Sequence, residues 1–274
     1  MIEFMHMELS ILEISKAVIL GIVEGITEFL PISSTGHLIL VNQFIFFDKD
    51  FTVLFDIIIQ LGAILAVLVY FFKKLWPCTN NILKNKETMS TWVKTIIGIL
   101  PVIVLGTVLS GFIKEKLFNP WVVALSLLLG GFVIIFIENK NKKEHVISMK
   151  DLSFKNAFFI GLIQCLSMIP GVSRSASTII GGMVLGVSRS VATEFSFFLA
   201  IPTMLAASVY SLFKYKGLIS SEQIYILIIG FMIAFIVALV VIKFLMNFVK
   251  KHNFKIFGYY RIILGIIIIL YLLV

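Results

Sequence analysis

Charged residues are scarce in this 274-residue chain. They make up 14% of it, against about a quarter of a typical globular domain, and only three are arginines: Arg174, Arg189 and Arg261. Hydrophobic residues make up 59%, and the mean hydropathy is +1.07. A soluble fold of this length cannot cover so much apolar surface, because its exterior must face water. The composition therefore excludes a soluble protein and predicts a single domain, residues 1–274, embedded in a membrane.

Features that define several other protein classes are missing. The two cysteines, Cys78 and Cys165, have no CxxC spacing and no histidine companions, which excludes a disulfide framework and a zinc site. Residues Met1–Ser10 contain no Lys or Arg, so a cleavable signal peptide is not expected. The formal net charge is +8, but the lysines lie in short loops between apolar segments rather than on one basic face. Nucleic-acid binding is therefore not expected.

Six apolar segments are long enough to cross the hydrocarbon core of a bilayer, which takes about 20 residues. Each is nearly free of charge along its length. They predict six transmembrane helices at Phe51–Phe72, Trp92–Phe112, Pro120–Ile137, Val191–Phe213, Ile224–Phe248 and Ile256–Val274.

Two further apolar regions, roughly Ile11–Phe47 and Phe154–Val187, are broken near their middles by Pro, Ser, Thr and Gly. The breaks lie at Pro31–His37 and Pro170–Ser175. Irregular backbone at membrane depth is tolerated only where it is buried in protein or lines a wet cavity. Both regions are therefore predicted to be re-entrant helical hairpins with polar tips.

The two halves of the chain resemble each other. One ungapped offset of 140 residues aligns the two breaks and the spans that follow them, and it predicts a duplicated chain with halves at about 10–135 and 150–274. The fold class is thus an all-α polytopic membrane protein, with six transmembrane helices and two re-entrant hairpins in inverted repeats. The aligned pairs include Gly21 with Gly161, Glu24 with Gln164, Thr27 with Ser167, Ser33 with Ser173, Thr35 with Ser175, Phe55 with Phe195, Ala66 with Ala206 and Lys74 with Lys214.

The lysines predict the topology. If the lysine-rich loops are cytoplasmic, the first hairpin enters from outside, the second enters from the cytoplasm, and both termini are external. Inverted repeats with broken helices place their site near the midplane, where the two tips meet. The cytoplasmic lysines are Lys73, Lys74, Lys84, Lys86, Lys140, Lys142, Lys143, Lys150, Lys250, Lys251 and Lys255, and the exceptions are Lys214 and Lys216.

Ionisable groups at membrane depth are costly and mark functional sites. Glu24 and Glu28 are four residues apart and share one helix face, so a cation lies between them or one of them acts as a general acid. Asp56 and Glu194 are explained equally well by ion pairing or by catalysis. Gln60 beside them is kept as a weak candidate for substrate binding.

The first break combines hydroxyls with a histidine. Ser33, Ser34 and Thr35, together with freed backbone N–H groups at a helix start, can form an anion-binding nest. His37 can act as a general base or acid, or attack phosphorus itself. The nucleophile is left open between Ser34, His37 and a water molecule.

The second break carries an arginine among hydroxyls. Arg174 can bind phosphate through its bidentate fork, with the hydroxyls of Ser173, Ser175 and Thr178 around it. Arg189 and Arg261, at span edges, are expected to snorkel or to anchor the chain on the cytoplasmic side.

These motifs resemble those of bacterial undecaprenyl-diphosphate phosphatases of the bacitracin-resistance type. The segment Glu24–Leu38 resembles the glutamate-rich motif of that family, and Pro170–Ser175 resembles its PGxSRSG motif. Ala176 stands where the family usually has Gly, which removes no functional group. The similarity runs from about Ile14 to the C-terminus.

The resemblance implies hydrolysis of undecaprenyl diphosphate to undecaprenyl phosphate and phosphate, which recycles the carrier for peptidoglycan synthesis. It implies Glu24, Glu28, Ser34, His37 and Arg174 as catalytic residues. It also implies a divalent cation, Mg or Ca, held by Glu24 and Glu28. The site would open to the outer face of the cytoplasmic membrane. The expected partners are the polyprenyl diphosphate lipid and the membrane, and a homodimer is left open. The alternative function is a polyprenyl-phosphate flippase or another inverted-repeat transporter.

Overall fold

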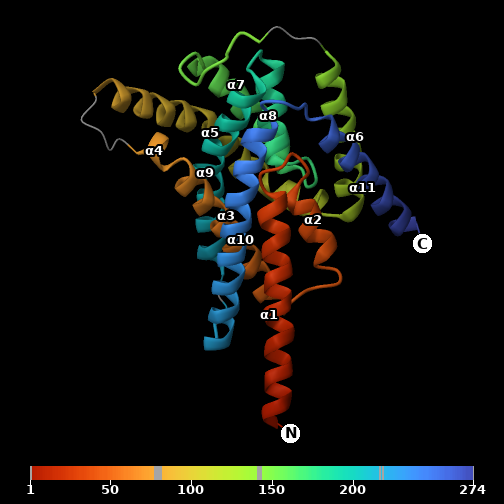
Figure 1. The fold of residues 1–274 in the computed structure, drawn as a ribbon. Coiled ribbons are helices and arrows are strands. Elements are labelled where there is room, and N and C mark those ends of the chain that lie inside the picture. Colours follow the sequence, from red (N-terminus) through yellow and green to blue (C-terminus); the bar gives the residue numbers. More distant parts are fainter. Residues whose placement is uncertain (1, 77–81, 141–143, 216, 218, 274) are drawn as a thin grey trace.

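The computed structural model describes residues 2–76, 82–140, 144–215, 217 and 219–273, and these residues are almost entirely helical (Figure 1). Within them, the only strand-like pairing is a single bridge between Val146 and Val187. The helices are α1 (Ile2–Thr27), α2 (Ser34–Val41), α3 (Lys49–Tyr70), α4 (Phe72–Leu75), α5 (Ile82–Lys116), α6 (Pro120–Asn139), α7 (Phe154–Gln164), the 3₁₀ turn η1 (Cys165–Met168), α8 (Arg174–Val184), α9 (Arg189–Lys214), α10 (Ser221–Phe248) and α11 (Lys255–Leu273). Cys78, Lys142, Lys143, Lys216 and Val274 lie outside the described residues.

The six predicted transmembrane helices are confirmed. Six of the described helices are long and apolar enough to cross a membrane: Lys49–Tyr70, Asn85–Leu109, Pro120–Asn139, Arg189–Lys214, Ser221–Phe248 and Lys255–Leu273.

The two broken regions reverse direction where the sequence predicts. Residues 28–35, here called the first tip, lead from the end of α1 into the first turn of α2, and residues 167–175, the second tip, lead from the end of η1 into the first turn of α8. Figure 1 shows α1 rising from the lower end of the molecule, whereas α7 and α8 lie at its upper end. The α1 helix is longer than predicted and begins well before Ile11. The re-entrant character of the two hairpins stays a prediction.

Helix packing follows a repeated pattern. α1 packs on α10 and α7 packs on α5, while α3 packs on α10 and α9 packs on α5. α6 and α11, the last helices of the two halves, pack on each other. This pattern is expected if the chain is duplicated and the first helix of each hairpin packs against a span of the other half.

Glycines permit the close contacts that α1 and α7 make with their partner spans. A Cβ on Gly21 of α1 would lie 2.9 Å from the carbonyl oxygen of Gly230 in α10. A Cβ on Gly161 of α7 would overlap the carbonyl oxygen of Gly98 in α5. Gly21 and Gly161 are aligned by the offset of 140 residues, so both hairpins approach their partner span at an equivalent point.

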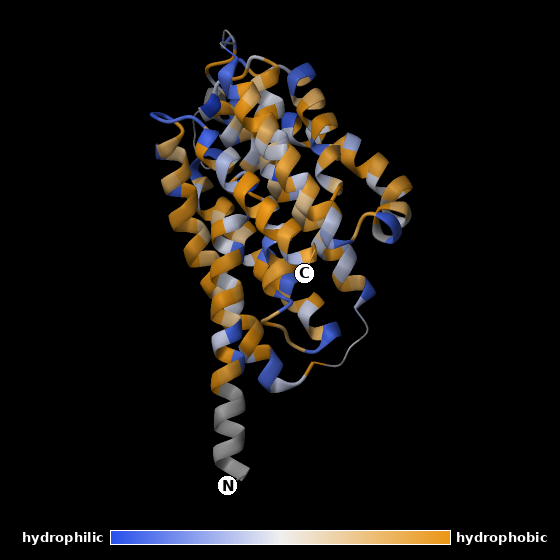
Figure 2. Cartoon of the chain, turned by 90° about the vertical axis from the view of Figure 1, so that its right-hand side faces the viewer, coloured by the Kyte–Doolittle hydropathy of each residue, from blue (hydrophilic) through white to orange (hydrophobic). Residues whose placement is uncertain are grey.

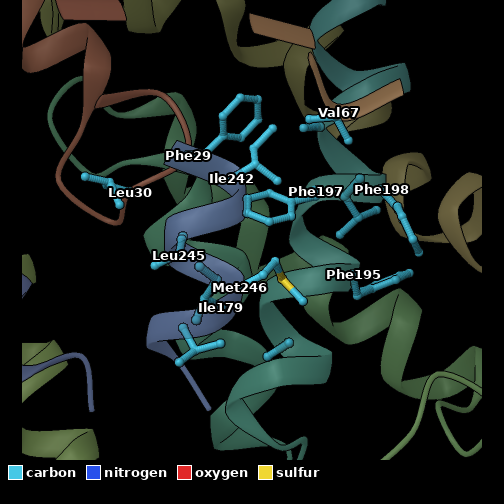
Figure 3. Close-up of a cluster of buried hydrophobic side chains, with 14 of the residues drawn as sticks. Phe29, Leu30, Val67, Ile179, Phe195, Phe197, Phe198, Ile242, Leu245 and Met246 are labelled. Atoms are coloured by element: carbon cyan, nitrogen blue, oxygen red, sulfur yellow. The ribbon is translucent and has the colours of Figure 1, made fainter. Parts of the chain in front are cut away.

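A large apolar core lies behind the tips (Figure 3). Phe29 of the first tip packs edge-on against Phe197 of α9, with ring centroids 5.3 Å apart and an interplanar angle of 89°. Phe71 also contacts Phe197, with ring centroids 5.9 Å apart. Because lipid is as apolar as this core, the aromatic contacts stabilise the fold by close packing, with about 0.5–1.5 kcal/mol for an edge-on pair, so the first tip is anchored by packing as well as by polar contacts.

The outer surface is apolar over most of its length. Figure 2 shows hydrophobic residues along the helices and a gathering of hydrophilic residues at the upper end. Large apolar side chains such as Val108, Leu129 and Phe213 are exposed. Contiguous apolar surface of this extent is unfavourable in water and favourable in lipid, which explains the composition.

The crossing of α5 and α7 yields a test. We expect Gly161→Ala to destabilise the protein by about 1–3 kcal/mol, because the added methyl group collides with the α5 backbone. Gly111→Ala is the matched control, since a Cβ there meets nothing within 4 Å. Thermal unfolding in detergent should show a lower midpoint for Gly161→Ala alone. Equal midpoints would contradict the close crossing.

Candidate functional site

In each tip, the serine directly before the following helix has an unusual backbone. Ser33 has φ 75° and ψ 90°, and Ser173 has φ 80° and ψ 122°. Among the described residues, these two alone have a positive φ without being glycine. Each side chain caps the helix that follows, because Ser33 accepts from the N–H of Gly36 and Ser173 from that of Ala176, both at 3.2 Å. Such backbone strain costs about 1–3 kcal/mol per residue and is concentrated at functional sites.

The two tips touch, as the sequence predicts. Arg174 Nη2 lies 3.2 Å from Glu28 Oε1, and both side chains are nearly buried. Ser175 Oγ donates a hydrogen bond of 2.8 Å to the carbonyl oxygen of Leu30. Residues about 145 positions apart in the chain are thus joined at one point.

A cavity of about 150 Å³ opens at this junction. Seven of the predicted site residues line it: Glu28, Ser33, Ser34, Thr35, Gln60, Ser173 and Arg174. The lining residues that the prediction did not name as site residues are Phe118, Ser167, Met168, Pro170, Gly171 and Met204. Of these, only Ser167 and the Pro170–Gly171 pair carried a signal in the sequence, through the repeat and the second motif.

Glu28 joins a hydroxyl to a guanidinium. Its Oε2 accepts a hydrogen bond of 2.5 Å from Ser34 Oγ, while its Oε1 faces Arg174. Ser34 and Arg174 are the first residues of α2 and α8, and the offset of 140 residues aligns them. Equivalent positions of the two tips therefore present a hydroxyl on one side and a guanidinium on the other.

The guanidinium of Arg174 is held by a backbone carbonyl and has one unused hydrogen-bond donor. Its Nη1 donates to the carbonyl oxygen of Ser196 in α9 at 2.9 Å. Its Nε is buried and has no hydrogen-bond partner in the described part of the chain. Thr178 Oγ1 lies 2.6 Å from Ser196 Oγ and does not line the cavity, and Ser175 also lies outside it. These two hydroxyls support the tips rather than facing the cavity.

Glu24 lies one helical turn from Glu28 but outside the cavity lining. It is 1% exposed, and neither carboxylate oxygen has a hydrogen-bond partner among the described residues. The nearby acid Asp56 differs from it, because Asp56 accepts a hydrogen bond of 3.0 Å from Asn42. The free oxygens of Glu24 suit a hard cation, which prefers carboxylate ligands, whereas both oxygens of Glu28 already have partners.

His37 also lies outside the cavity. Its Nδ1 is 2.7 Å from the carbonyl oxygen of Ser33, and its Nε2 is 2.6 Å from the hydroxyl of Tyr260. A carbonyl only accepts, so Nδ1 carries the proton and Nε2 accepts from Tyr260. The histidine thus braces the strained serine of the first tip.

The remaining buried acids belong to ion pairs away from the cavity. Glu194 pairs with Lys74 at 2.8 Å, which favours the ion-pair interpretation over catalysis. Arg189 pairs with Glu138 at 2.5 Å, and Glu138 also accepts from the backbone N–H of Phe254.

The expectation that Arg261 snorkels is wrong. Arg261 is fully buried, and its guanidinium donates hydrogen bonds to five backbone carbonyl oxygens, which belong to the two tips and to α6. Arg261 lies in an apolar run at the start of a span, and its burial depends on residues that are distant in sequence. The signal that could have identified this role of Arg261 is the high cost of placing a cation inside an apolar segment.

Comparison with known proteins gives one consistent result. The family model described as "Bacitracin resistance protein BacA" matches residues 17–267. The chain is 52% identical over 266 residues to "Undecaprenyl-diphosphatase 1" of Clostridioides difficile (strain 630), covering 96% of this chain and 97% of that protein. It is 50% identical over 272 residues to "Undecaprenyl-diphosphatase" of Lachnoclostridium phytofermentans, covering 96% and 98%. It is 47% identical over 273 residues to "Undecaprenyl-diphosphatase" of Enterococcus faecalis, covering 96% and 99%.

The two motifs that form the tips lie within the matched residues, and the similarity extends over nearly the whole length of the relatives. The chain therefore belongs to the BacA family of bacitracin resistance proteins.

Proposed function

We propose that this membrane phosphatase, which hydrolyses undecaprenyl diphosphate to undecaprenyl phosphate and phosphate, does so in the cavity between the two tips. The observation that carries the proposal is the arrangement around Glu28. One of its carboxylate oxygens holds the Ser34 hydroxyl and the other faces Arg174, and all three residues line the same cavity. A nucleophile, its base and a phosphate-binding group are therefore adjacent.

Substrate binding follows from the free and exchangeable donors of Arg174. Its Nε has no partner, and its Nη2 can exchange Glu28 for a phosphate oxygen. Such fork-shaped, charge-assisted hydrogen bonds are the strongest that a side chain offers to phosphate. The contact between Nη1 and the Ser196 carbonyl keeps the guanidinium in place during the exchange. Arg174 thus holds the terminal phosphoryl group and stabilises its developing charge.

Ser34 is the nucleophile in this proposal. Its oxygen attacks the terminal phosphorus and its proton passes to Glu28, while the bond from phosphorus to the bridging oxygen breaks and undecaprenyl phosphate leaves. Water then attacks the phosphoserine, which releases phosphate and restores the serine hydroxyl. The hydrogen bond from Ser34 to Glu28 supports this choice. His37 is assigned a positioning role, because both of its nitrogens are engaged outside the cavity.

A divalent cation, Mg or Ca, is part of the proposal. Glu24 would hold it, because its two oxygens are buried and unpartnered among the described residues. Such a cation would supply positive charge one helical turn from Glu28, beside the cavity.

We assign the protein to the cytoplasmic membrane of a bacterium, with the cavity open to the outer face. Lysines follow the ends of α3, α6 and α10, which lie toward the upper end of the molecule in Figure 1. Phe118, which lines the cavity, lies between α5 and α6, at the opposite ends of those helices. The positive-inside rule then places the lysine-rich end in the cytoplasm. A homodimer stays a prediction.

A transporter of the same lipid is the rival function. It would need the phosphate-binding Arg174 but no hydroxyl held on a carboxylate beside it. Phosphate release from a polyprenyl diphosphate in detergent, where no gradient exists, separates the two. We expect release by the purified chain, and its complete absence from folded protein would contradict the phosphatase assignment.

In that assay we expect Arg174→Lys to lower kcat/KM by about 10²–10³-fold, because an ammonium group keeps the charge but loses the planar fork. Arg189→Lys is the matched control, since it makes the same change in an ion pair remote from the cavity. Near-normal hydrolysis by a folded Arg174→Lys variant would remove Arg174 from the phosphate site.

The two buried acids provide a second comparison. Glu28→Gln retains shape but cannot accept the proton of Ser34, so hydrolysis should be abolished or its dependence on Mg or Ca changed. Glu194→Gln weakens only the pair with Lys74 and should be much milder. The measurement is the hydrolysis rate of each variant at saturating substrate. A larger loss in Glu194→Gln than in Glu28→Gln would refute the role of Glu28.

A further inference from the structure

We infer that Arg261 of α11 is a positioning residue that sets the spacing of the two tips and thereby the rate of phosphoryl transfer. The inference rests on the proposed site between the tips. Arg261 itself is absent from the lining of the cavity.

The guanidinium of Arg261 contacts three separate parts of the chain. Its Nη1 donates to the carbonyl oxygen of Pro31 in the first tip at 3.3 Å. In the second tip, Val172 and Gly171 accept from Nη1 and Nη2, each at 3.0 Å. In α6, Ser126 accepts from Nη2 at 3.0 Å and Leu127 from Nε at 3.4 Å. One side chain thus ties both tips to each other and to a transmembrane helix.

These contacts supply hydrogen-bond donors to backbone carbonyls that lie outside helices. The carbonyls of Pro31, Gly171 and Val172 belong to non-helical segments, where no helical N–H is available to pair with them. A carbonyl left unpaired in a low-dielectric interior destabilises the fold, because it loses its hydrogen bonds to water without replacement. Arg261 has no carboxylate partner among the described ion pairs, so its hydrogen-bonding capacity goes to carbonyls.

The fork of arginine is required for this arrangement. Five N–H groups on three nitrogens in one plane can reach acceptors on different segments, whereas the three donors of lysine share one nitrogen. The fold also leaves room for the guanidinium, because a Cβ on Gly130 of α6 would overlap Nη2. Glycine at this position is therefore needed for the close approach of α6 to Arg261.

The contacts of Arg261 lie directly behind the reacting groups. Pro31 is three residues before Ser34, and Val172 is two residues before Arg174. The neighbouring Tyr260 stacks on His37, with ring centroids 5.6 Å apart, and bonds its Nε2. A shift of either tip changes the distance between the attacking hydroxyl and the held phosphoryl group, and displacements of about 1 Å can cost 10²-fold in rate.

The kinetic consequence is specific. The groups that contact substrate remain in place on each tip when Arg261 is changed, so affinity should alter little. The alignment between the tips should suffer, so kcat should fall far more than KM changes. If Arg261 were needed only for folding, its substitution would lower the amount of active protein. It would not lower the kcat of the folded fraction while leaving KM nearly unchanged.

The test combines kinetics with a direct measure of tip spacing. Thr35→Cys and Ser167→Cys place thiols on opposite tips, at residues that both line the cavity, in a chain whose Cys78 and Cys165 are replaced by serine. A short bifunctional thiol reagent reports their separation without any need for catalysis. The kinetic variants are Arg261→Lys and Gly130→Ala, with Arg189→Lys and Gly111→Ala as their matched controls.

We expect Arg261→Lys to lower kcat at least about tenfold, to change KM by less than about threefold and to reduce cross-linking, while both controls resemble the unchanged chain. If Arg261→Lys does not fold, Gly130→Ala becomes the deciding variant. Its added methyl group shifts the guanidinium of Arg261, but the arginine itself is retained. Normal kcat, normal cross-linking, or a rise in KM alone in the deciding variant would overturn the inference. Failure of the proposed site would appear differently, as normal hydrolysis by Arg174→Lys with unchanged cross-linking.

Discussion

The fold depends on satisfying the broken backbone that is buried between its helices. Two chain reversals leave carbonyl groups without helical partners in an interior that offers them little water. The fully buried guanidinium of Arg261 donates to the carbonyls of Pro31, Gly171 and Val172, and so replaces water as their partner. The same contacts bring the two tips to one place. The polar cavity lies at this junction of the two tips.

The two tips are alike in backbone and different in chemistry. Ser33 and Ser173 share a strained, left-handed conformation and the same capping role. The next residues, Ser34 and Arg174, enter the cavity from equivalent positions, and Glu28 binds both. Equivalent backbone positions thus hold a hydroxyl on one side and a guanidinium on the other, which in the proposed mechanism act as nucleophile and phosphate receptor. In that proposal, the ion pair of Glu28 and Arg174 keeps both groups in place until a phosphate competes for the arginine.

Much of this could be predicted from the sequence. The spans follow from hydropathy, the breaks from Pro31 and Pro170, and the residues around the cavity from hydroxyls and charges inside apolar runs. Three details could not be predicted. The exclusion of His37 from the cavity depends on Tyr260, which is 223 residues away. The role of Arg261 depends on Pro31, which is 230 residues away. The free oxygens of Glu24 depend on how neighbouring helices pack. Local pattern reveals none of these contacts between distant helices.

The central claim is that one residue from each tip acts on the same phosphoryl group. A double-mutant cycle on kcat/KM tests it most directly, with Ser34→Ala, Arg174→Lys and the double variant compared in detergent. If the two residues act as a unit, the double variant should be about as slow as the slower single variant. Losses that simply multiply would show that Ser34 and Arg174 act independently, and would contradict a site built from both tips.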